Sequence, residues 1–238
     1  MDAVTVDEGP AGASLALIVV AAGSATRMQG RDKVWIPVCG RPLVQHSISR
    51  LAPLASRLVL VCKAEDVDRA NRFLDEVVGD RVPWRAVPGG RRRQDSVRNG
   101  LEAIGDESHV AVHDAARPLA TSELLLRVWR AACEHGAAIP AVPVADTIKR
   151  IDGSRVMETL DRSQLWAAQT PQVFERPLLE RVFADPRWEL ETATDEASML
   201  EALGHSVRIE TGERDNLKVT AAEDLAVVET LATESYSR

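Results

Sequence analysis

An unbroken apolar run, LALIVV at residues 15–20, is followed at once by the small-residue segment AAGSATRM at residues 21–28. A run without polar positions predicts a strand buried on both faces, as in the parallel sheets of α/β proteins. Small residues let a ligand approach the backbone, whose N–H groups can bind phosphate oxygens. Arg27 and Lys33 add positive charges to this loop. The segment therefore predicts a polyanion site or, as the plain alternative, a turn that only joins strand to helix.

The pattern of strand followed by helix repeats along the chain to about residue 145. We expect strands at 58–62, 85–87, 109–113 and 137–145, and helices at 41–51, 65–78, 95–104 and 121–136. This alternation predicts an α/β fold with a Rossmann-like, mostly parallel sheet flanked by helices on both faces. Ligands bind outside the carboxyl ends of such strands, so the loops at 21–33, 89–96 and 114–118 should converge.

The alternation ends at Thr147, where two short β-type segments flank Asp152-Gly153. Asp-Gly is typical of hairpin turns, so residues 147–162 are predicted to form a protruding β-ribbon arm. An isolated ribbon is marginally stable in water, so the arm packs either on its own domain or on a second subunit. The rest of the chain predicts helices at 176–183 and 195–203, a strand at 206–210 and a last helix from 220. We expect a single domain over residues 1–238, with residues 1–14 disordered.

Composition excludes several classes of partner. The net charge of −7 argues against a nucleic acid or an anionic membrane, which needs a broad basic face. The longest apolar run covers residues 15–22, far below the ~20 residues of a membrane-spanning helix. Acidic residues precede that run where a secretory signal is basic, so a cytoplasmic location is expected. The three cysteines lie far apart and indicate neither a disulfide framework nor a zinc site.

A glycine turn followed by arginines, GGRRRQDS, occupies residues 89–96 at the end of a predicted strand. Several arginines in a row are usually a solvated face, but after a glycine turn Arg93 is a candidate to face an anion. The backbone of Gly89 and Gly90 and the hydroxyl of Ser96 could read the edge of a base. We interpret this segment as part of a nucleotide site.

A carboxylate and a guanidinium follow the next buried strand in HDAARP, residues 113–118. Asp114 can cap the following turn, since aspartate is a common cap residue. It can also face a metal ion or sugar hydroxyls, with Arg117 nearby. Both interpretations stay open at this point.

The motifs AAGSATRM, GGRRRQDSV, HDAARP, DTIKR, QTPQVF, TDEAS and NLKVT occur in this order between about residues 15 and 228. In them the chain resembles the 2-C-methyl-D-erythritol 4-phosphate cytidylyltransferases of the non-mevalonate isoprenoid pathway. The resemblance implies a nucleotidyltransferase that joins CTP and 2-C-methyl-D-erythritol 4-phosphate, giving 4-diphosphocytidyl-2-C-methyl-D-erythritol and pyrophosphate. It also implies a Mg²⁺ cofactor and a homodimer formed through the 147–162 arm.

The resemblance also assigns roles to single residues. Cytosine and ribose would be held by Ala21, Ala22, Gly23, Gly89, Gly90 and Ser96. Catalysis would depend on Arg27 and Lys33, which hold the triphosphate and stabilise the leaving pyrophosphate. It would also depend on Lys218, which lines the polyol phosphate side and reaches toward the α-phosphate. The polyol phosphate would be bound by Asp114, Arg117, Thr147, Arg162, Thr170 and Thr194. Thr147 and Arg162 would belong to the neighbouring subunit's site, and Asp114 is the candidate metal ligand.

These residue types suit the reaction. A phosphate monoester has a second pKa of ~6 and is already mostly ionised at neutral pH, so no general base is required. Positive charges that bring two polyanions together are what the reaction needs. Within the class, a ribitol 5-phosphate cytidylyltransferase is the alternative. Two alternatives come from other classes. A dinucleotide-binding oxidoreductase is disfavoured because this chain lacks the glycines and the acidic residue of the dinucleotide fingerprint. A nucleotide-binding protein without chemistry would bind CTP but release no pyrophosphate.

Overall fold

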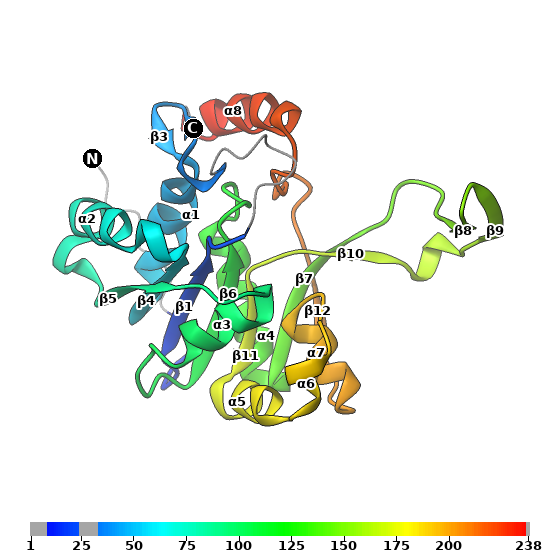
Figure 1. Ribbon diagram of the computed structural model, residues 1–238, viewed down its shortest axis with the longest axis horizontal. Coiled ribbons are helices and arrows are strands. Elements are labelled where there is room, and N and C mark those ends of the chain that lie inside the picture. Colours follow the sequence, from blue (N-terminus) through cyan, green and yellow to red (C-terminus); the bar gives the residue numbers. More distant parts are fainter. Residues whose placement is uncertain (1–8, 24–32, 237–238) are drawn as a thin grey trace.

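The computed structural model describes residues 9–23 and 33–236 of the chain. Its main sheet is built from the strands β1 (Leu15–Val20), β4 (Arg57–Cys62), β5 (Trp84–Pro88), β6 (His109–Asp114), β7 (Ala137–Pro143), β10 (Trp166–Ala168), β11 (Gln172–Glu175) and β12 (Arg208–Thr211). The sheet has eight strands in the order β10-β7-β11-β6-β1-β4-β5, with β12 paired to β7 (Figure 1). β1 pairs in parallel with both β4 and β6. Only β10 and β11 run against their neighbours in the described sheet. The mostly parallel Rossmann-like sheet is confirmed.

Helices cover both faces of this sheet. The helices are α1 (Leu43–Leu51), α2 (Val67–Val77), α3 (Arg93–Leu101), α4 (Ser122–His135), α5 (Arg176–Ala184), α6 (Arg187–Leu190), α7 (Glu196–Ala202) and α8 (Ala222–Tyr236). Short 3-10 turns lie at η2 (Lys33–Trp35), η3 (Ala52–Leu54), η4 (Ala64–Asp66), η5 (Gly79–Arg81) and η6 (Arg162–Gln164). Core residues of α1, α2 and α4 pack on one face, and those of α3, α5 and α7 pack on the other. The helical layers follow the predicted alternation.

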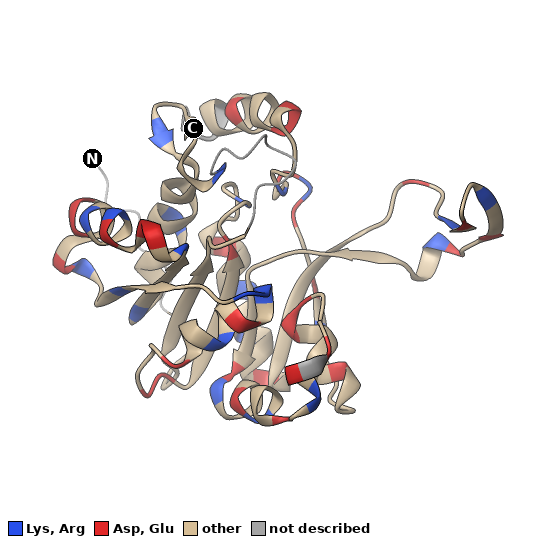
Figure 2. Cartoon of the chain, in the orientation of Figure 1, with Lys and Arg blue, Asp and Glu red and all other residues tan. Residues whose placement is uncertain are grey.

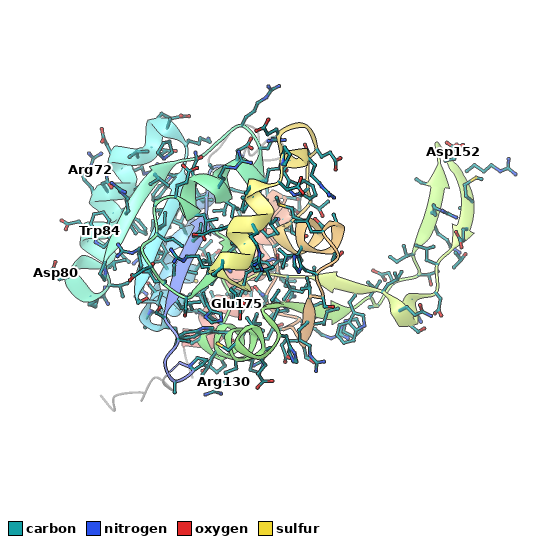
Figure 3. All side chains as sticks on the ribbon, turned by 90° about the horizontal axis from the view of Figure 1, so that it is seen from below. Arg72, Asp80, Trp84, Arg130, Asp152 and Glu175 are labelled. Carbon is teal, nitrogen blue, oxygen red and sulfur yellow. The ribbon has the colours of Figure 1, made fainter. Side chains whose placement is uncertain are left out.

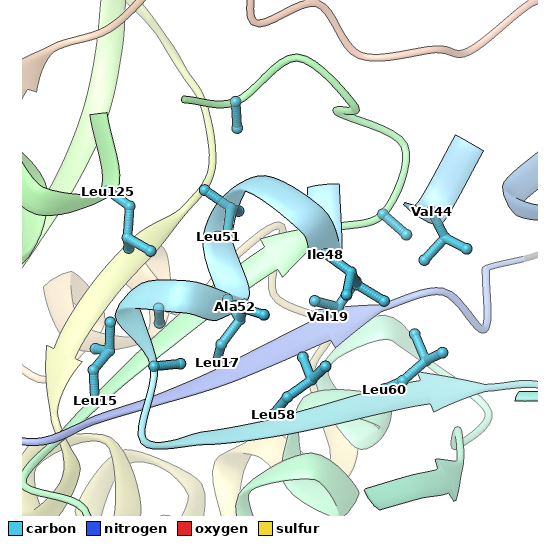
Figure 4. Packing of buried hydrophobic residues seen from close by; sticks show 14 of the residues in the cluster. Leu15, Leu17, Val19, Val44, Ile48, Leu51, Ala52, Leu58, Leu60 and Leu125 are labelled. Carbon is cyan, nitrogen blue, oxygen red and sulfur yellow. The ribbon is translucent and has the colours of Figure 1, made fainter. Parts of the chain in front are cut away.

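The central strand shows why its sequence has no polar position. Leu15, Leu17 and Val19 face the core shared with α1 and α4, whereas Ile18 faces the other core. All four side chains are 0% exposed. Figure 4 shows Leu17 beside Ala52, the first residue of η3, with Leu58 of β4 nearby. Because β1 is buried on both faces, its carboxyl end lies inside the molecule. The small-residue loop that begins at Ala21 follows this end.

Local signals set the ends of the long helix α4. The Thr121 hydroxyl caps its start by accepting from the Leu124 N–H at 3.0 Å. Gly136 ends it with a φ of 81°, a left-handed conformation that glycine adopts without strain. Both predicted ends of this helix are confirmed.

Other predicted boundaries were wrong. The helix placed at 95–104 begins at Arg93 and ends at Leu101. Pro42 belongs to the two-residue strand β3 (Arg41–Pro42), which pairs with β2 (Pro37–Val38), and precedes α1 instead of starting it. The strands β10 and β11 were not predicted, because short segments around Pro171 have no clear alternation. They insert antiparallel strands between β6 and β7 and next to β7.

Residues 9–14 are not disordered, contrary to the prediction. The Ser14 N–H donates to Ser108 Oγ and the Ser108 N–H donates to Ser14 Oγ, both at 3.0 Å. A Cβ on Gly9 would lie 2.1 Å from the Trp129 ring, so the chain passes directly against α4 there. Tertiary contacts therefore order a segment whose composition is typical of a frayed end. Residues 1–8 lie outside the described part.

The predicted ribbon forms a hairpin of β8 (Lys149–Asp152) and β9 (Arg155–Thr159), with Gly153 at the turn. Figure 1 shows it standing away from the body, joined by β7 and β10. Every residue of both strands is exposed. The hairpin therefore does not fold back on its own domain. Among the described residues, none of the helices is long and apolar enough to span a membrane.

Candidate active site

A pocket lies at the carboxyl ends of β1 and β6. The described residues that line it are Val20, Ala21, Gly23, Lys33, Val34, Arg93, Asp114, Ala116 and Lys218. They come from the loops after β1 and β6, from η2, from the start of α3 and from the segment before α8. The predicted convergence of three loops is confirmed for the described residues. The chain then brings Lys218 to the same place from about one hundred residues further on.

Asp114 is the acidic centre of this pocket. Its Oδ2 accepts from Lys218 Nζ at 2.6 Å, and its Oδ1 accepts from Arg93 Nε at 3.2 Å. Burial by itself raises the pKa of Asp114, but the charges of Arg93 and Lys218 outweigh burial and hold that pKa well below its usual range. Asp114 is therefore a carboxylate at any pH at which the protein works.

Arg93 is held from behind by a buried acid. Its Nη1 donates to both carboxylate oxygens of Glu196, at 2.7 and 2.9 Å, and Glu196 is 0% exposed. Burial would lower the pKa of Arg93, but Glu196 and Asp114 raise it above its ordinary value. Arg93 therefore keeps its charge although most of its side chain is enclosed.

Lys33 and Lys218 are brought together by backbone contacts. Lys33 Nζ donates to the Val219 carbonyl at 3.0 Å. The Val219 N–H in turn donates to the Ala116 carbonyl at 2.8 Å, which fastens this segment to the turn after β6. Of the lining residues that the structure describes, two lysines and one arginine thus share the pocket with one carboxylate, a balance that favours an anionic ligand.

Arg117 lies beside the pocket, not among the described residues that line it. Its Nη1 donates to the Asn216 carbonyl at 2.7 Å and its Nη2 to the Ala168 carbonyl at 3.2 Å. Asn216 is itself buried and donates to the Thr170 carbonyl. Arg117 therefore joins the turn after β6 to β10 and to the segment that carries Lys218.

Thr170 lies behind Asp114. The Thr170 hydroxyl accepts from the Asp114 backbone N–H at 3.0 Å and contacts His113 Nδ1 at 3.1 Å. His113 Nε2 lies 3.1 Å from the Arg117 carbonyl, which can only accept, so Nε2 carries the proton. Burial lowers the pKa of His113 to about 4, so the ring is neutral. The unprotonated His113 Nδ1 must then accept from the Thr170 hydroxyl. The hydrogen bonds therefore run from the Asp114 N–H to Thr170, from Thr170 to His113, and from His113 to the Arg117 carbonyl.

The glycine turn makes a tight surface next to Ala22. A Cβ on Gly89 would lie 2.3 Å from the Ala22 Cβ, so only glycine allows this approach. The Gly90 N–H donates to Ser96 Oγ at 3.1 Å. The predicted nucleotide-side residues Ala22, Gly89, Gly90 and Ser96 are therefore side by side.

Three predicted substrate residues lie away from the pocket. Thr147 and Arg162 are exposed at the base of the arm, and the Arg162 guanidinium donates to the Ala145 carbonyl. Figure 3 shows the arm separated from the body in a second view, with Asp152 at its far end. Thr194 is exposed just before α7, where its hydroxyl contacts Ser198 Oγ at 3.3 Å. Arg27 lies outside the described residues.

Two residues with clear structural roles were missed. Glu196 lies inside the TDEAS motif, and His113 opens HDAARP, but neither was singled out. An acid at a helix start usually faces solvent, and a lone histidine in an apolar strand usually fills a core. The one sequence signal that could have pointed to them is that they lie inside the HDAARP and TDEAS motifs, which were already selected.

The distribution of charged residues agrees with the net charge of −7, which argues against a nucleic acid or an anionic membrane as a partner. Figure 2 shows Lys and Arg positions interspersed with Asp and Glu positions along the ribbon, without a long segment of one sign. The positive groups that matter are those collected in the pocket. An α/β sheet with such a pocket at its carboxyl edge defines a protein that binds phosphorylated ligands, as nucleotidyltransferases do.

Comparison with known proteins gives the family. The family model described as 2-C-methyl-D-erythritol 4-phosphate cytidylyltransferase matches residues 15–234. A protein of that name from Rubrobacter xylanophilus is 46% identical over 90% of this chain and 93% of its own. One from Alkaliphilus oremlandii is 41% identical over 90% and 92%. The chain belongs to the 2-C-methyl-D-erythritol 4-phosphate cytidylyltransferase family.

Solved structures agree with this assignment. The 4-diphosphocytidyl-2C-methyl-D-erythritol synthase of Anaerococcus prevotii has a TM-score of 0.82 at 27% identity, covering 93% of this chain and 99% of its own. The 2-C-methyl-D-erythritol 4-phosphate cytidylyltransferase of Thermus thermophilus has a TM-score of 0.76 at 29% identity, covering 92% and 99%. The chain is therefore an enzyme of the nucleotidyltransferase class, and neither the oxidoreductase nor the ribitol 5-phosphate alternative is favoured.

Proposed function

We propose that this chain transfers the cytidylyl group of CTP to 2-C-methyl-D-erythritol 4-phosphate, giving 4-diphosphocytidyl-2-C-methyl-D-erythritol and pyrophosphate. The observation that carries the proposal is the convergence of Lys33, Arg93, Asp114 and Lys218 on one pocket, in a chain of this family. An oxygen of the polyol phosphate attacks the α-phosphorus of CTP. The bond from that phosphorus to the oxygen that bridges it to the β-phosphate breaks, and the electron pair leaves with pyrophosphate.

The obstacle to this reaction is charge, because two polyanions meet and a third departs. Lys33 and Lys218 lie where they can offset that charge, and Arg27 is assigned the same role. The attacking phosphate is already ionised near neutral pH, so no side chain has to remove a proton. His113 agrees with this, since its ring is buried and both nitrogens are engaged within the protein.

The nucleoside is proposed to lie on the glycine turn. Ala21, Ala22 and Gly23 follow β1. Gly89 lies against Ala22, and the Gly90 N–H donates to Ser96 Oγ. Backbone N–H and carbonyl groups of such a turn can distinguish cytosine from other bases. Asp114, Arg117, Thr170 and Thr194 are assigned to the polyol phosphate side. For Thr170 the hydrogen bonds support an indirect part, through the backbone of Asp114.

Mg²⁺ is the proposed cofactor. Mg²⁺ is usually bound by one or two carboxylates together with substrate phosphates and water. Among the described residues that line the pocket, Asp114 supplies one carboxylate, and CTP would supply phosphate oxygens. No group of three acidic, histidine or cysteine side chains suited to a metal occurs in the described ranges, so the proposal relies on the phosphate oxygens of CTP as further ligands. When bound, Mg²⁺ would neutralise phosphate charge.

We also propose a homodimer held by the arm. The arm and its base expose Ile151, Val156, Met157 and Trp166, which are 61%, 55%, 56% and 42% exposed. Apolar side chains grouped on a protruding ribbon are typical of an interface. Thr147 and Arg162 at the arm base would then reach the partner's pocket. Met157→Glu should shift the protein to monomers in light scattering, whereas a wild-type monomer would contradict the dimer. A cytoplasmic location stays a prediction of the sequence.

The test of the activity is pyrophosphate release. We expect release from CTP and 2-C-methyl-D-erythritol 4-phosphate with Mg²⁺, and its loss when EDTA removes the metal. Ribitol 5-phosphate in place of the methylerythritol substrate, and ATP, GTP or UTP in place of CTP, are the controls. Equal or faster turnover with ribitol 5-phosphate would reassign the substrate. CTP binding without pyrophosphate release would leave a binding protein.

A further inference from the structure

Four charged groups of alternating sign form a line into the pocket: Glu196, Arg93, Asp114 and Lys218. We call this line the charge chain. Successive contacts measure 2.7 Å between Glu196 and Arg93, 3.2 Å between Arg93 and Asp114, and 2.6 Å between Asp114 and Lys218. The charge chain is therefore two short ion pairs joined by a longer contact. Arg93 has its shorter contact with Glu196, and Asp114 has its shorter contact with Lys218. Arg93 also reaches Asp114 Oδ1 through both Nε and Nη2, each at 3.2 Å.

The inner ion pair, Glu196 with Arg93, is held in place by its neighbours. Both Glu196 oxygens accept from Arg93 Nη1, and this positive charge stabilises the carboxylate form, although burial raises the pKa of Glu196. Glu196 directly follows Asp195, which caps α7 by accepting from the Ser198 N–H at 2.9 Å. Gln172 of β11 donates to Asp195 at 2.9 Å and anchors that cap to the sheet. The start of α7 thus holds Glu196 in one place.

The outer ion pair, Asp114 with Lys218, is accessible to a ligand that could replace one partner. The side chain of Lys218 is 42% exposed and that of Asp114 is 12% exposed, whereas that of Glu196 is 0% exposed. Asp114 and Lys218 line the pocket, and Glu196 is not among the described residues that do. A ligand can therefore separate Asp114 from Lys218 while Glu196 and Arg93 stay paired.

We infer that Glu196 is a positioning residue: it occupies the Arg93 guanidinium and so leaves the Asp114 carboxylate available to an exchangeable second cation. That cation is Lys218 in this structure and a divalent metal ion when nucleotide is bound. Lys218, released from Asp114, is then available to a phosphate. This inference rests on the proposed function, because the exchange needs a metal–nucleotide ligand.

Neutralising Glu196 should change the affinity for a metal ion and the affinity for CTP in different ways. With Glu196→Gln, Arg93 loses its stronger partner and pairs fully with Asp114. Asp114 then attracts a metal ion less, while the pocket as a whole gains one positive charge and attracts CTP at least as well. A merely structural loss of packing would weaken the binding of both ligands.

The experiment measures the two ligands separately. CTP binding without metal is measured by calorimetry, and Mn²⁺ binding in the presence of CTP by electron paramagnetic resonance with Mg²⁺ as competitor. For Glu196→Gln we expect metal affinity to fall at least about fivefold, with metal-free CTP affinity unchanged or up to about fivefold higher. Glu196→Asp, which keeps the charge, should restore part of the metal affinity.

Two further variants make the test specific. Glu107→Gln removes another buried acid, which pairs with Arg57 at 2.8 Å beside the amino ends of β4 and β6, and should leave both affinities unchanged. The double variant Arg93→Gln/Glu196→Gln removes both members of the inner pair. Because Asp114 then loses Arg93 as a competitor, metal affinity should return toward that of the wild type. The double variant also covers the case in which Glu196→Gln alone does not fold.

Two results would overturn the role of Glu196. One is a folded Glu196→Gln protein whose CTP and metal affinities fall together. The other is a double variant that binds metal as weakly as the single variant, or more weakly. A wild-type protein that does not bind CTP would instead end the proposed function, so the two failures are distinguishable.

Discussion

The pocket and the arm contain similar residue types but use them in opposite ways. In the pocket, Arg93, Asp114 and Glu196 pair with one another in an enclosed place. On the arm, Arg150 pairs with Glu158 in full contact with solvent, where such a pair contributes little to stability, and Ile151 and Met157 are exposed. The pocket's described groups find partners within one chain, whereas the arm's apolar groups do not. The comparison shows a site whose described charges are paired within one chain, and an arm whose apolar side chains stay exposed in one chain.

The largest effect is expected from the two lysines of the pocket. Lys33→Ala and Lys218→Ala should each lower kcat by ~10²–10³, because they offset charge that develops during the reaction. CTP affinity should fall much less, since the charge they meet is greatest in the transition state. Steady-state kinetics and calorimetry measure the two. Arg208→Ala, an exposed cation on β12, is the control, and wild-type turnover in either lysine variant would remove that lysine from the mechanism.

A second experiment tests whether arm and pocket belong to different subunits. Arg162→Ala and Lys33→Ala homodimers should each be nearly inactive. Mixing them after dissociation should recover about a quarter of wild-type activity, because half of the dimers are mixed and each has one intact site. Mixing Lys33→Ala with the double variant Lys33→Ala/Arg162→Ala should recover nothing. If the first mixture also recovers nothing, the arm serves its own subunit.

A third prediction concerns the buried histidine behind the pocket. The pKa of His113 is lowered from 6.5 to about 4, so between these values the unfolded chain binds more protons than the folded one. Stability contributed by neutral His113 is therefore complete above pH 6.5 and is lost as pH falls toward 4. The loss from pH 7 to pH 5 is about 2 kcal/mol.

Urea unfolding at pH 7 and pH 5 measures this loss. His113→Gln should lower stability at pH 7 and reduce the change between the two pH values by about that amount. His205→Gln, at an exposed turn after α7, should leave the change as in the wild type. An undiminished pH dependence in His113→Gln would place the titrating group elsewhere.

The smallest effect is expected at Thr170. Thr170→Val keeps the shape but leaves the buried Asp114 N–H without its acceptor, which should cost about 1–2 kcal/mol of stability. Thr170→Ser keeps the hydroxyl and should restore most of it. If Thr170 acts through Asp114, kcat should change more than the KM for the polyol phosphate. A change confined to that KM would instead make Thr170 a direct substrate contact.

Much of the scaffold was predictable because its signals are local. The apolar run 15–20 could only be a buried strand, and Thr121 and Gly136 mark the two ends of α4. The Asp152-Gly153 pair predicted the hairpin. By contrast, β10 and β11 are short and flank Pro171, so no local pattern marks them. β11 becomes a strand because it pairs with both β6 and β7, and β10 becomes one by pairing with β7.

The sequence by itself also determined which motifs meet at the pocket, since Lys33, Arg93, Asp114 and Lys218 were all selected from their motifs and all line it. Only the tertiary structure decided how these charges are paired. Glu196 and Arg93 lie about one hundred residues apart in the chain, and no local pattern reports a contact between them. Their meeting depends on how α3 and α7 pack on the same face of the sheet. Ion pairing is a property of distance in space, and a linear sequence contains it only through the fold.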